Sequence, residues 1–411
     1  MDQKSQNNTS TFYGLGIAPA MIELLERLKF TIPTPIQLKA IPIAIEGKDV
    51  IGVAQTGTGK TLAFGVPMIQ RLLQKPGNAL VLVPTRELAI QVEEVIVKIG
   101  QPFNIRAAVI IGGASIFNQI KALRMNPRVI IATPGRLLDH LRNEKVNLKH
   151  IHTIVLDEAD RMLDMGFAPQ INDILKHVPS ERQTMLFSAT IPDKILKIAS
   201  TYMKLPVSIE VAPSGTTVEN VIQELYIIRR DDKSVLLLKF LDQYRGTVLI
   251  FCRTKRGASH IVRGLREHNF SAAEIHSNRS LAQRREALEG FKNGRYRILV
   301  ATDIASRGID VKGIELVINY DLPDDAENYV HRIGRTARAG HSGRAISFAT
   351  PDQKGLIRSI ESVMRNTLPV AKHPDIVPSE FFGSDVKINP APHLYRRGQS
   401  RRDQYKRGYR R

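Results

Sequence analysis

The chain has 411 residues, of which 59 are Lys or Arg and 40 are Asp or Glu, so its formal net charge at pH 7 is +19. Hydrophobic residues make up 43% and there is one cysteine, which disfavours a disordered, collagen-like or membrane protein and excludes an internal disulfide or a thiolate zinc site. The first 30 residues have no long apolar core, so no secretory signal is expected. We therefore predict a cytoplasmic protein of two or three domains whose positive charge attracts polyanions, nucleic acid above all.

Short apolar runs alternate with helix-like stretches between Asp49 and Lys204. The helix-like stretches include Glu87 to Ile99 and Gly135 to Leu141, where apolar residues recur at helical spacing. Continuous apolar runs between helices are typical of parallel strands buried on both faces. The predicted strands are DVIGVA, ALVLVP, RAAVIIG, VIIATP, TIVLDEAD and TMLFSAT.

A second series of the same kind begins near Val221. Its helix-like stretches include Ser234 to Tyr244 and Ala282 to Asn293, and its predicted strands are QELYIIR, TVLIFCR, SAAEIH, RILVATD, ELVINYD and RAISFAT. The segment between the two series, LPVSIEVAPSGTTVEN, has the Pro, Gly and Ser content of a linker. We expect two tandem α/β parallel-sheet domains, divided as follows: 1–30 N-terminal flank, 31–205 first domain, 206–219 linker, 220–365 second domain, and 366–411 extension with a basic tail.

The last 17 residues, YRRGQSRRDQYKRGYRR, hold eight Lys or Arg and one Asp, a local net charge of +7. The segment has no aliphatic residue, so we predict a disordered tail. Arginine together with tyrosine favours single-stranded nucleic acid, because guanidinium groups meet phosphates while rings stack on bases. A tail that only improves solubility is the alternative.

A phosphate-binding loop is predicted at 54–61, where AQTGTGKT follows the strand DVIGV and precedes a helical stretch. Glycines let backbone N–H groups approach phosphate oxygens, and the helix N-terminus adds a favourable dipole. Lys60 can reach the terminal phosphates and the Thr61 hydroxyl can bind Mg²⁺. The pattern departs from the usual one at Ala54, where a glycine is common. An ordinary Gly-rich turn is the alternative, which the flanking strand and helix disfavour.

An acidic tetrad, Asp157-Glu158-Ala159-Asp160, comes directly out of another apolar strand about a hundred residues downstream. In phosphoryl transfer such carboxylates hold the metal and orient the attacking water. We expect Asp157 to hold Mg²⁺ and Glu158 to polarise the water. A solvated acidic turn is the bland alternative.

The loop and the tetrad together resemble the DEAD-box family of RNA-dependent ATPases and helicases, within superfamily 2. Further matches follow in the family's order across residues 12 to 350, and the basic tail and compactness resemble the bacterial RhlE-like subgroup. The resemblance implies two RecA-like domains that bind ATP, Mg²⁺ and RNA. The further matching segments are 30–37 (the Q motif, with Phe12 upstream), 84–89, 112–113, 133–136, 188–190, 249–254, 301–310 and 331–338.

The resemblance assigns roles around the nucleotide. Gln37 would bind the adenine edge, Phe30 would stack on the ring, and Asp310 would contact the ribose. Arg335 and Arg338 would reach the γ-phosphate as arginine fingers from the second domain, so that Lys60, Glu158 and these two arginines form the catalytic set. The full set expected to bind ATP is Phe12, Phe30, Gln37, Thr56, Gly57, Thr58, Gly59, Lys60, Thr61 and Asp310.

The same resemblance assigns RNA and coupling residues. RNA backbone contacts are expected from Thr85, Arg86, Gly113, Thr133, Arg136, Arg253, Thr302 and Arg307. Coupling between nucleotide and RNA is expected from Asp160, Ser188, Thr190 and His331. Leu281 departs from the family pattern, because a glutamine is usual three residues before Arg284. Since none of these residues reads base edges, binding is expected to be independent of sequence.

Three functions fit these motifs. The leading one is an RNA-dependent ATPase that locally unwinds or remodels RNA duplexes and RNA–protein complexes. The alternatives are an ATP-gated RNA clamp with little true unwinding, and a DNA translocase, against which the Q motif and tetrad argue. Cys252 follows an apolar strand and is expected to be buried, without a redox role.

Overall fold

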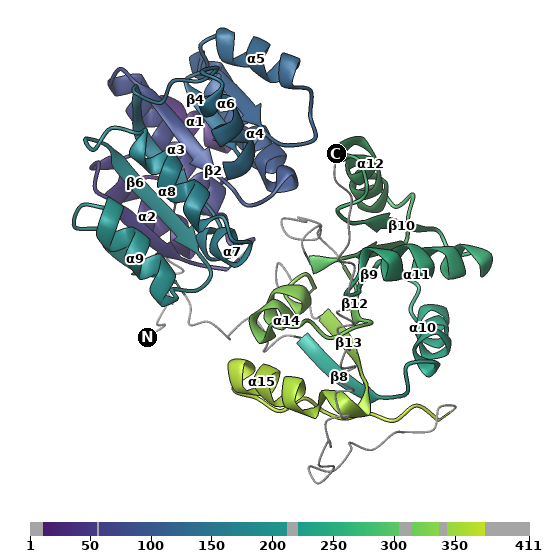
Figure 1. The fold of residues 1–411 in the computed structure, drawn as a ribbon. Coiled ribbons are helices and arrows are strands. Elements are labelled where there is room, and N and C mark those ends of the chain that lie inside the picture. Colours follow the sequence, from purple (N-terminus) through teal and green to yellow (C-terminus); the bar gives the residue numbers. More distant parts are fainter. Residues whose placement is uncertain (1–10, 56, 212–220, 304–313, 337–342, 375–411) are drawn as a thin grey trace, which may run out of the picture.

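The computed structural model describes residues 11–55, 57–211, 221–303, 314–336 and 343–374. They form two α/β units, and the second unit turns helices α12 (Leu281–Lys292) and α14 (Ala326–Ile333) toward the first (Figure 1). The predictions for Thr56, Arg307, Asp310, Arg338 and the basic tail lie outside the described residues.

The first unit is built on a parallel sheet of seven strands in the order β3-β4-β2-β5-β6-β1-β7. The six predicted strands are all present. Most of their residues are buried, because helices cover both faces, and this is why their sequences are continuously apolar. The strands are β1 (Val50–Val53), β2 (Asn78–Leu82), β3 (Ala107–Ile110), β4 (Val129–Ala132), β5 (Ile151–Leu156), β6 (Gln183–Ser188) and β7 (Val207–Glu210).

Two hydrophobic clusters fill the two faces of this sheet. Neighbouring residues of β1 point to opposite faces, so that Val50 belongs to one cluster and Ile51 to the other. Helices α1 (Pro19–Arg27), α2 (Pro35–Ile45), α3 (Lys60–Gln74) and α4 (Arg86–Gly100) pack on the first cluster. Helices α6 (Pro134–Arg142), α7 (Ala159–Asp164), α8 (Ala168–Lys176) and α9 (Asp193–Tyr202) pack on the second, while α5 (Ile116–Arg124) follows β3.

The second unit is a parallel sheet of six strands in the order β10-β11-β9-β12-β13-β8. Its helices also cover both faces: α12, α14 and α15 (Lys354–Met364) on one, and α10 (Asp232–Gln243) and α11 (Lys255–Glu267) on the other. Cys252 is fully buried, as expected. The strands are β8 (Val221–Ile227), β9 (Val248–Phe251), β10 (Ala272–Ile275), β11 (Ile298–Ala301), β12 (Leu316–Asn319) and β13 (Gly343–Ala349).

The structure differs from the expected domain boundaries in three places. Strand β7 pairs with β1, so the first sheet includes residues that the sequence assigned to the linker at 206–219. Helix α1 and Phe12 belong to the first core, so the expected flank at 1–30 is part of this unit from at least residue 12. Val370, in the expected extension, bridges Leu225 of β8.

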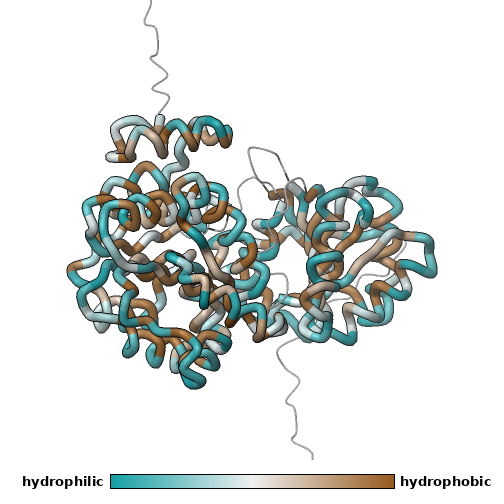
Figure 2. The backbone as a smooth tube through the Cα atoms, turned by 90° about the horizontal axis from the view of Figure 1, so that it is seen from above, coloured by the Kyte–Doolittle hydropathy of each residue, from teal (hydrophilic) through white to brown (hydrophobic). Residues whose placement is uncertain are grey.

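Hydropathy follows this architecture. Brown and teal positions alternate along the helices in Figure 2, because each helix buries one face against a sheet. Within the described segments, no helix has the length and apolarity needed to cross a membrane.

Candidate active site

The phosphate-binding loop, the acidic tetrad and the segment 188–190 meet at one edge of the first sheet. They follow β1, β5 and β6, which are adjacent in the order β5-β6-β1. Since all three strands are parallel, their carboxyl ends share an edge, where open α/β sheets bind ligands. The fold therefore brings together three motifs that lie up to about 130 residues apart in the chain.

Two glycines shape the phosphate-binding loop. Gly57 (φ 83°) and Gly59 (φ 87°) are left-handed, and Gly59 is the N-cap of α3. Lys60 begins this helix, is buried, and its Nζ donates a hydrogen bond to the Ala54 carbonyl at 3.0 Å. The lysine therefore folds back over the loop, and Thr61 follows it in the first helical turn.

Gln37 holds this loop from the side. Its Nε2 donates to the Gly59 carbonyl at 2.9 Å and its Oε1 accepts from the Thr34 backbone N–H at 2.9 Å. A side chain at position 59 would collide with it, because a Cβ there would lie 2.4 Å from Gln37 Nε2. Gln37 thus caps α2 and ties the Q motif to the phosphate loop.

The two aromatic residues of the Q motif differ in depth. Phe30 is partly buried and packs against the first core. Phe12 is 3% exposed and lies inside that core. Its ring belongs to the same cluster as the buried residues of α1, and its contact with the nucleotide stays a prediction.

The tetrad carboxylates are buried at the end of β5. Asp157 is 2% exposed, and burial raises its pKa to about 6 although Lys60 opposes this. Glu158 adopts a left-handed φ of 51° and its Oε2 pairs with Arg161 Nη1 at 3.1 Å. The buried carboxylate at the end of β5 and the Thr61 hydroxyl in the first turn of α3 are oxygen donors, the kind of ligand that Mg²⁺ prefers.

Asp160 links the tetrad to the segment after β6. Its Oδ2 accepts from the Ala189 N–H at 2.9 Å, the Thr190 N–H at 3.1 Å and the Thr190 hydroxyl at 3.4 Å. Ser188 contributes differently from Thr190, because its Oγ accepts from the Asp160 backbone N–H at 3.3 Å. Burial raises the pKa of Asp160, but Lys60, His331 and Arg161 outweigh it and hold this pKa below its usual value.

Two predicted residues of the second unit reach this edge. His331 and Arg335 line a small cavity together with Arg161 of the first unit. Burial, followed by the charge of Arg161, lowers the pKa of His331 well below its usual value, and the nearby Asp160 carboxylate opposes this. Arg335 is 4% exposed. The coupling and finger residues thus come together across the interface between the units.

Arg332 is a site residue that sequence reasoning missed. Its guanidinium forms a bidentate pair with Asp303, at 2.5 and 2.7 Å, and lies over the Phe251 ring. It also borders the cavity that Arg335 lines, and its pair with Asp303 ties α14 to the segment after β11. The signal available in the sequence was an arginine between His331 and Arg335 together with an acidic residue after β11.

Five predicted RNA residues gather at the ends of β2, β3 and β4, which are neighbours in the first sheet. Arg86 lies so close to Gly113 (φ 76°) that a Cβ there would be 2.2 Å from Arg86 Nη1. Arg136 Nη1 donates to the Ala114 carbonyl at 3.3 Å. The residues that the fold brings together are Thr85, Arg86, Gly113, Thr133 and Arg136.

In the second sheet, predicted RNA residues also lie at the carboxyl ends of neighbouring strands. Arg253 follows β9 and is exposed, with its Nε 3.3 Å from Asp324, and Thr302 follows the neighbouring strand β11.

Leu281 packs against the first core, and Arg284 Nη2 lies 2.7 Å from Glu87 Oε2 of α4. Leu281, which departs from the family pattern, therefore makes an apolar contact between the units. Glu87 is, after Arg332, a second residue of this region that the sequence analysis did not single out.

Comparisons with known proteins agree with this arrangement. The DEAD/DEAH box helicase profile matches residues 34–198, and the helicase conserved C-terminal domain profile matches 232–340. The DEAD-box ATP-dependent RNA helicase CshA of Geobacillus kaustophilus is 45% identical over 370 residues, which cover 89% of this chain and 79% of that protein. The chain belongs to the DEAD-box helicase family.

Other relatives of this DEAD-box protein include the ATP-dependent rRNA helicase RRP3 of Meyerozyma guilliermondii, 42% identical over 90% of this chain and 78% of that one. Among solved structures, Saccharomyces cerevisiae Dbp5 bound to RNA and ADP BeF3 superposes with a TM-score of 0.80 at 30% identity, over 88% of this chain and 95% of that one. Mss116 bound to single-stranded RNA and UDP-BeF gives 0.81 at 28% identity, over 89% and 79%. The names CshA and RRP3 do not confirm the expected RhlE-like subgroup.

Proposed function

We propose that this DEAD-box protein hydrolyses ATP with Mg²⁺ when RNA is bound, and that it thereby locally unwinds or remodels RNA duplexes and RNA–protein complexes in the cytoplasm. The observation that carries the proposal is the meeting of Lys60 and the tetrad with His331 and Arg335 across the two units. Relatives bound to RNA with ADP BeF3 or UDP-BeF support the same pair of ligands.

Glu158 is the proposed base. It lies at the end of β5 with its carboxylate oriented by Arg161, and it would take a proton from the attacking water. Lys60 and the backbone N–H groups of 57–61 would hold the phosphates and neutralise charge that grows in the transition state. Mg²⁺, held by Asp157 and the Thr61 hydroxyl, would supply further charge neutralisation on the phosphate oxygens.

Arg335 and Arg338 are the proposed arginine fingers. Since Arg335 belongs to the second unit and Lys60 to the first, the active site is complete only when the two units are together. The loop 188–190, which shares four hydrogen bonds with Asp160, is the proposed link from the nucleotide to the RNA surface.

RNA would lie across the carboxyl ends of both sheets. Arg86 and Arg136 in the first unit and Arg253 in the second are the proposed phosphate contacts, and the same role is proposed for Arg307. Gly113 and the helix N-termini at Thr85 and Thr133 expose backbone N–H groups to the same strand. Contacts of this kind hold the backbone and read no bases.

One experiment separates this function from a clamp or a DNA translocase. ATP turnover is measured without nucleic acid, with single-stranded RNA and with single-stranded DNA, beside unwinding of a short RNA duplex. RNA-stimulated turnover with strand separation is expected. Stimulation without separation would indicate a clamp, and equal stimulation by DNA would indicate a translocase.

A further inference from the structure

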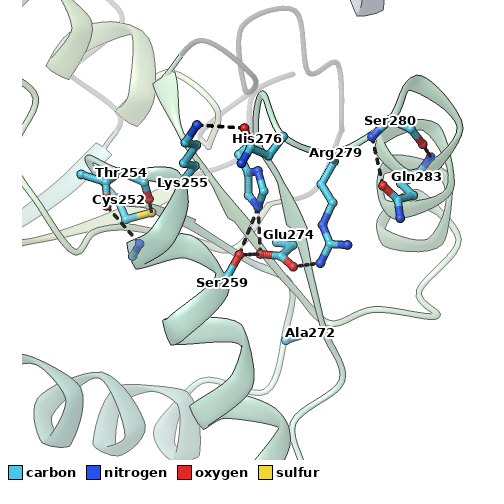
Figure 3. A network of polar contacts seen from close by, with 12 residues as sticks. Cys252, Thr254, Lys255, Ser259, Ala272, Glu274, His276, Arg279, Ser280 and Gln283 are labelled. Carbon is cyan, nitrogen blue, oxygen red and sulfur yellow. Dashed lines mark hydrogen bonds and ion pairs between the residues drawn. The ribbon is translucent and has the colours of Figure 1, made fainter. Parts of the chain in front are cut away.

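A second pocket lies in the second unit, outside the cleft between the two units. It sits beside α11 and the loop that follows β10, and Figure 3 shows the network that forms one wall. Its volume is about 250 Å³, below the roughly 300–1,000 Å³ of pockets for drug-sized molecules. Its lining residues are Lys255, Arg256, Ser259, His260, Arg263, His276 and Asn278.

Positive charge gathers in this pocket because of helical spacing. Arg256, His260 and Arg263 recur four and three residues apart, so they share one face of α11. Both arginines are exposed, and neither forms an ion pair within the described part of the chain. The lining contains no Asp or Glu. Like charges on one helix face repel, and an anion in the pocket would relieve this.

The acidic residue behind the wall does not neutralise these cations. Glu274 is buried, and its Oε2 accepts from the Ser259 hydroxyl at 2.6 Å and from His276 Nε2 at 3.0 Å (Figure 3). Its other oxygen pairs with Arg279. Burial, followed by the charges of Lys255 and Arg284, lowers the pKa of His276. The ring therefore supports the wall through its bond to Glu274 and is not counted among the positive charges of the pocket.

The rim of the pocket is also ordered. Lys255 Nζ donates to Asn278 Oδ1 at 2.9 Å, which joins the start of α11 to the loop after β10. Thr254 caps the helix by accepting from the Gly257 N–H at 3.0 Å. The positive end of the helix dipole therefore lies at the same rim, where it favours an anion.

We propose that this pocket binds a phosphate group of the RNA strand, next to the predicted contacts and in addition to them. The inference rests on the proposed function. Arg253 stands two residues before Lys255, so a strand that crosses the edge of the second sheet reaches the pocket as it continues. The size of the pocket suits one phosphate with part of its sugar, and its arginines provide forked donors for phosphate oxygens.

The test is a double variant of the full chain, Arg256→Gln with Arg263→Gln. Affinity for fluorescent single-stranded RNA is measured over a series of strand lengths and salt concentrations. For long strands, the dissociation constant at low salt is expected to rise about tenfold, and the slope of log K against log salt to fall by about 0.7, the value for one phosphate contact on a single strand. Short strands that fill only the cleft should bind as before.

A matched control removes the same charge elsewhere. Arg358→Gln with Arg365→Gln changes two exposed arginines at α15, outside the pocket. An equal change in salt slope for both double variants would overturn the pocket assignment, as would unaltered binding of long RNA by the pocket variant. Failure of the proposed function would be distinct, because the unmodified chain would then show no RNA-stimulated ATP turnover.

Inorganic phosphate is the second probe. The imidazole signals of His260 are followed by NMR while phosphate is added to the full chain, with circular dichroism to check that the variants fold. Shifts that saturate and disappear in Arg256→Gln with Arg263→Gln support the proposal. Phosphate binding with no effect of the variant on RNA would overturn it, because the pocket would then serve a different anion.

Discussion

At the scale of single residues, the site consists of buried polar groups whose partners are already in place. Asp160 accepts from Ala189 and Thr190 through Oδ2 and from the Arg161 N–H through Oδ1, and Gln37 has both amide atoms hydrogen-bonded to the backbone. Buried polar groups are costly without partners, so each of these side chains is fixed in one orientation. A substitution at one of these residues is therefore expected to change both its proposed function and the local structure.

Replacing Glu158 with Gln should abolish turnover while ATP and RNA still bind. Glutamine has nearly the same shape but cannot accept the proton of the attacking water, and loss of a general base costs about 10²–10⁴ in rate. Single-turnover hydrolysis and equilibrium binding are the measurements. Normal hydrolysis in this variant would remove Glu158 from the base role.

Replacing Gln37 with Ala should have two separable effects. Loss of the adenine contact should weaken the preference for ATP over GTP, measured as the ratio of their dissociation constants. Loss of the α2 cap and of the bond to Gly59 should lower the free energy of unfolding by about 1 kcal/mol. A lower stability with unaltered discrimination would show that Gln37 acts on the loop alone.

At the scale of elements, the sequence predicted the strands that are mostly buried. Twelve strands were found because each is a short apolar run between helices, and the loop and tetrad were located because they adjoin such runs. Strand β7 was missed: it lies at the sheet edge, only Ile209 is buried, and Pro and Gly nearby indicated a linker. The Glu87–Arg284 pair could not be predicted, because 197 residues separate its members.

Substitution of Gly113 tests how the ends of β2, β3 and β4 place the predicted RNA contacts. Gly113→Ala should strain a left-handed turn and force the Arg86 guanidinium away from it. RNA affinity is expected to fall by about tenfold, while ATP affinity without RNA stays the same. Gly135→Ala is the control, since a Cβ there meets nothing within 4 Å. Equal losses in both variants would contradict the close packing of Arg86 as the cause.

At the scale of the molecule, the contact between the two units decides when the site is complete. Arg284 and Glu87 are both buried where α12 meets α4. Burial raises the pKa of Glu87, and Arg284 counteracts this, so the carboxylate depends on its partner to remain charged. The pair therefore favours the arrangement in which Arg335 lies near the tetrad.

Arg284→Ala should leave Glu87 buried without its partner, which costs about 3–5 kcal/mol for a buried pair. The units should then separate more often, seen as a larger distance between fluorescent labels on α4 and α12, and RNA-stimulated turnover should fall. Replacing both residues by apolar ones, Glu87→Leu with Arg284→Met, should restore much of the closed population. No recovery would indicate that the pair acts through charge alone.

The Glu87–Arg284 pair is not among the proposed contacts with ATP or RNA, and it joins the two units directly. The pair therefore stabilises the closed arrangement, and this favours the binding of ATP and the binding of RNA alike. If ATP tightens RNA binding by some factor, RNA must tighten ATP binding by the same factor, because binding free energies are reciprocal. Weakening this one pair should reduce both factors to the same extent.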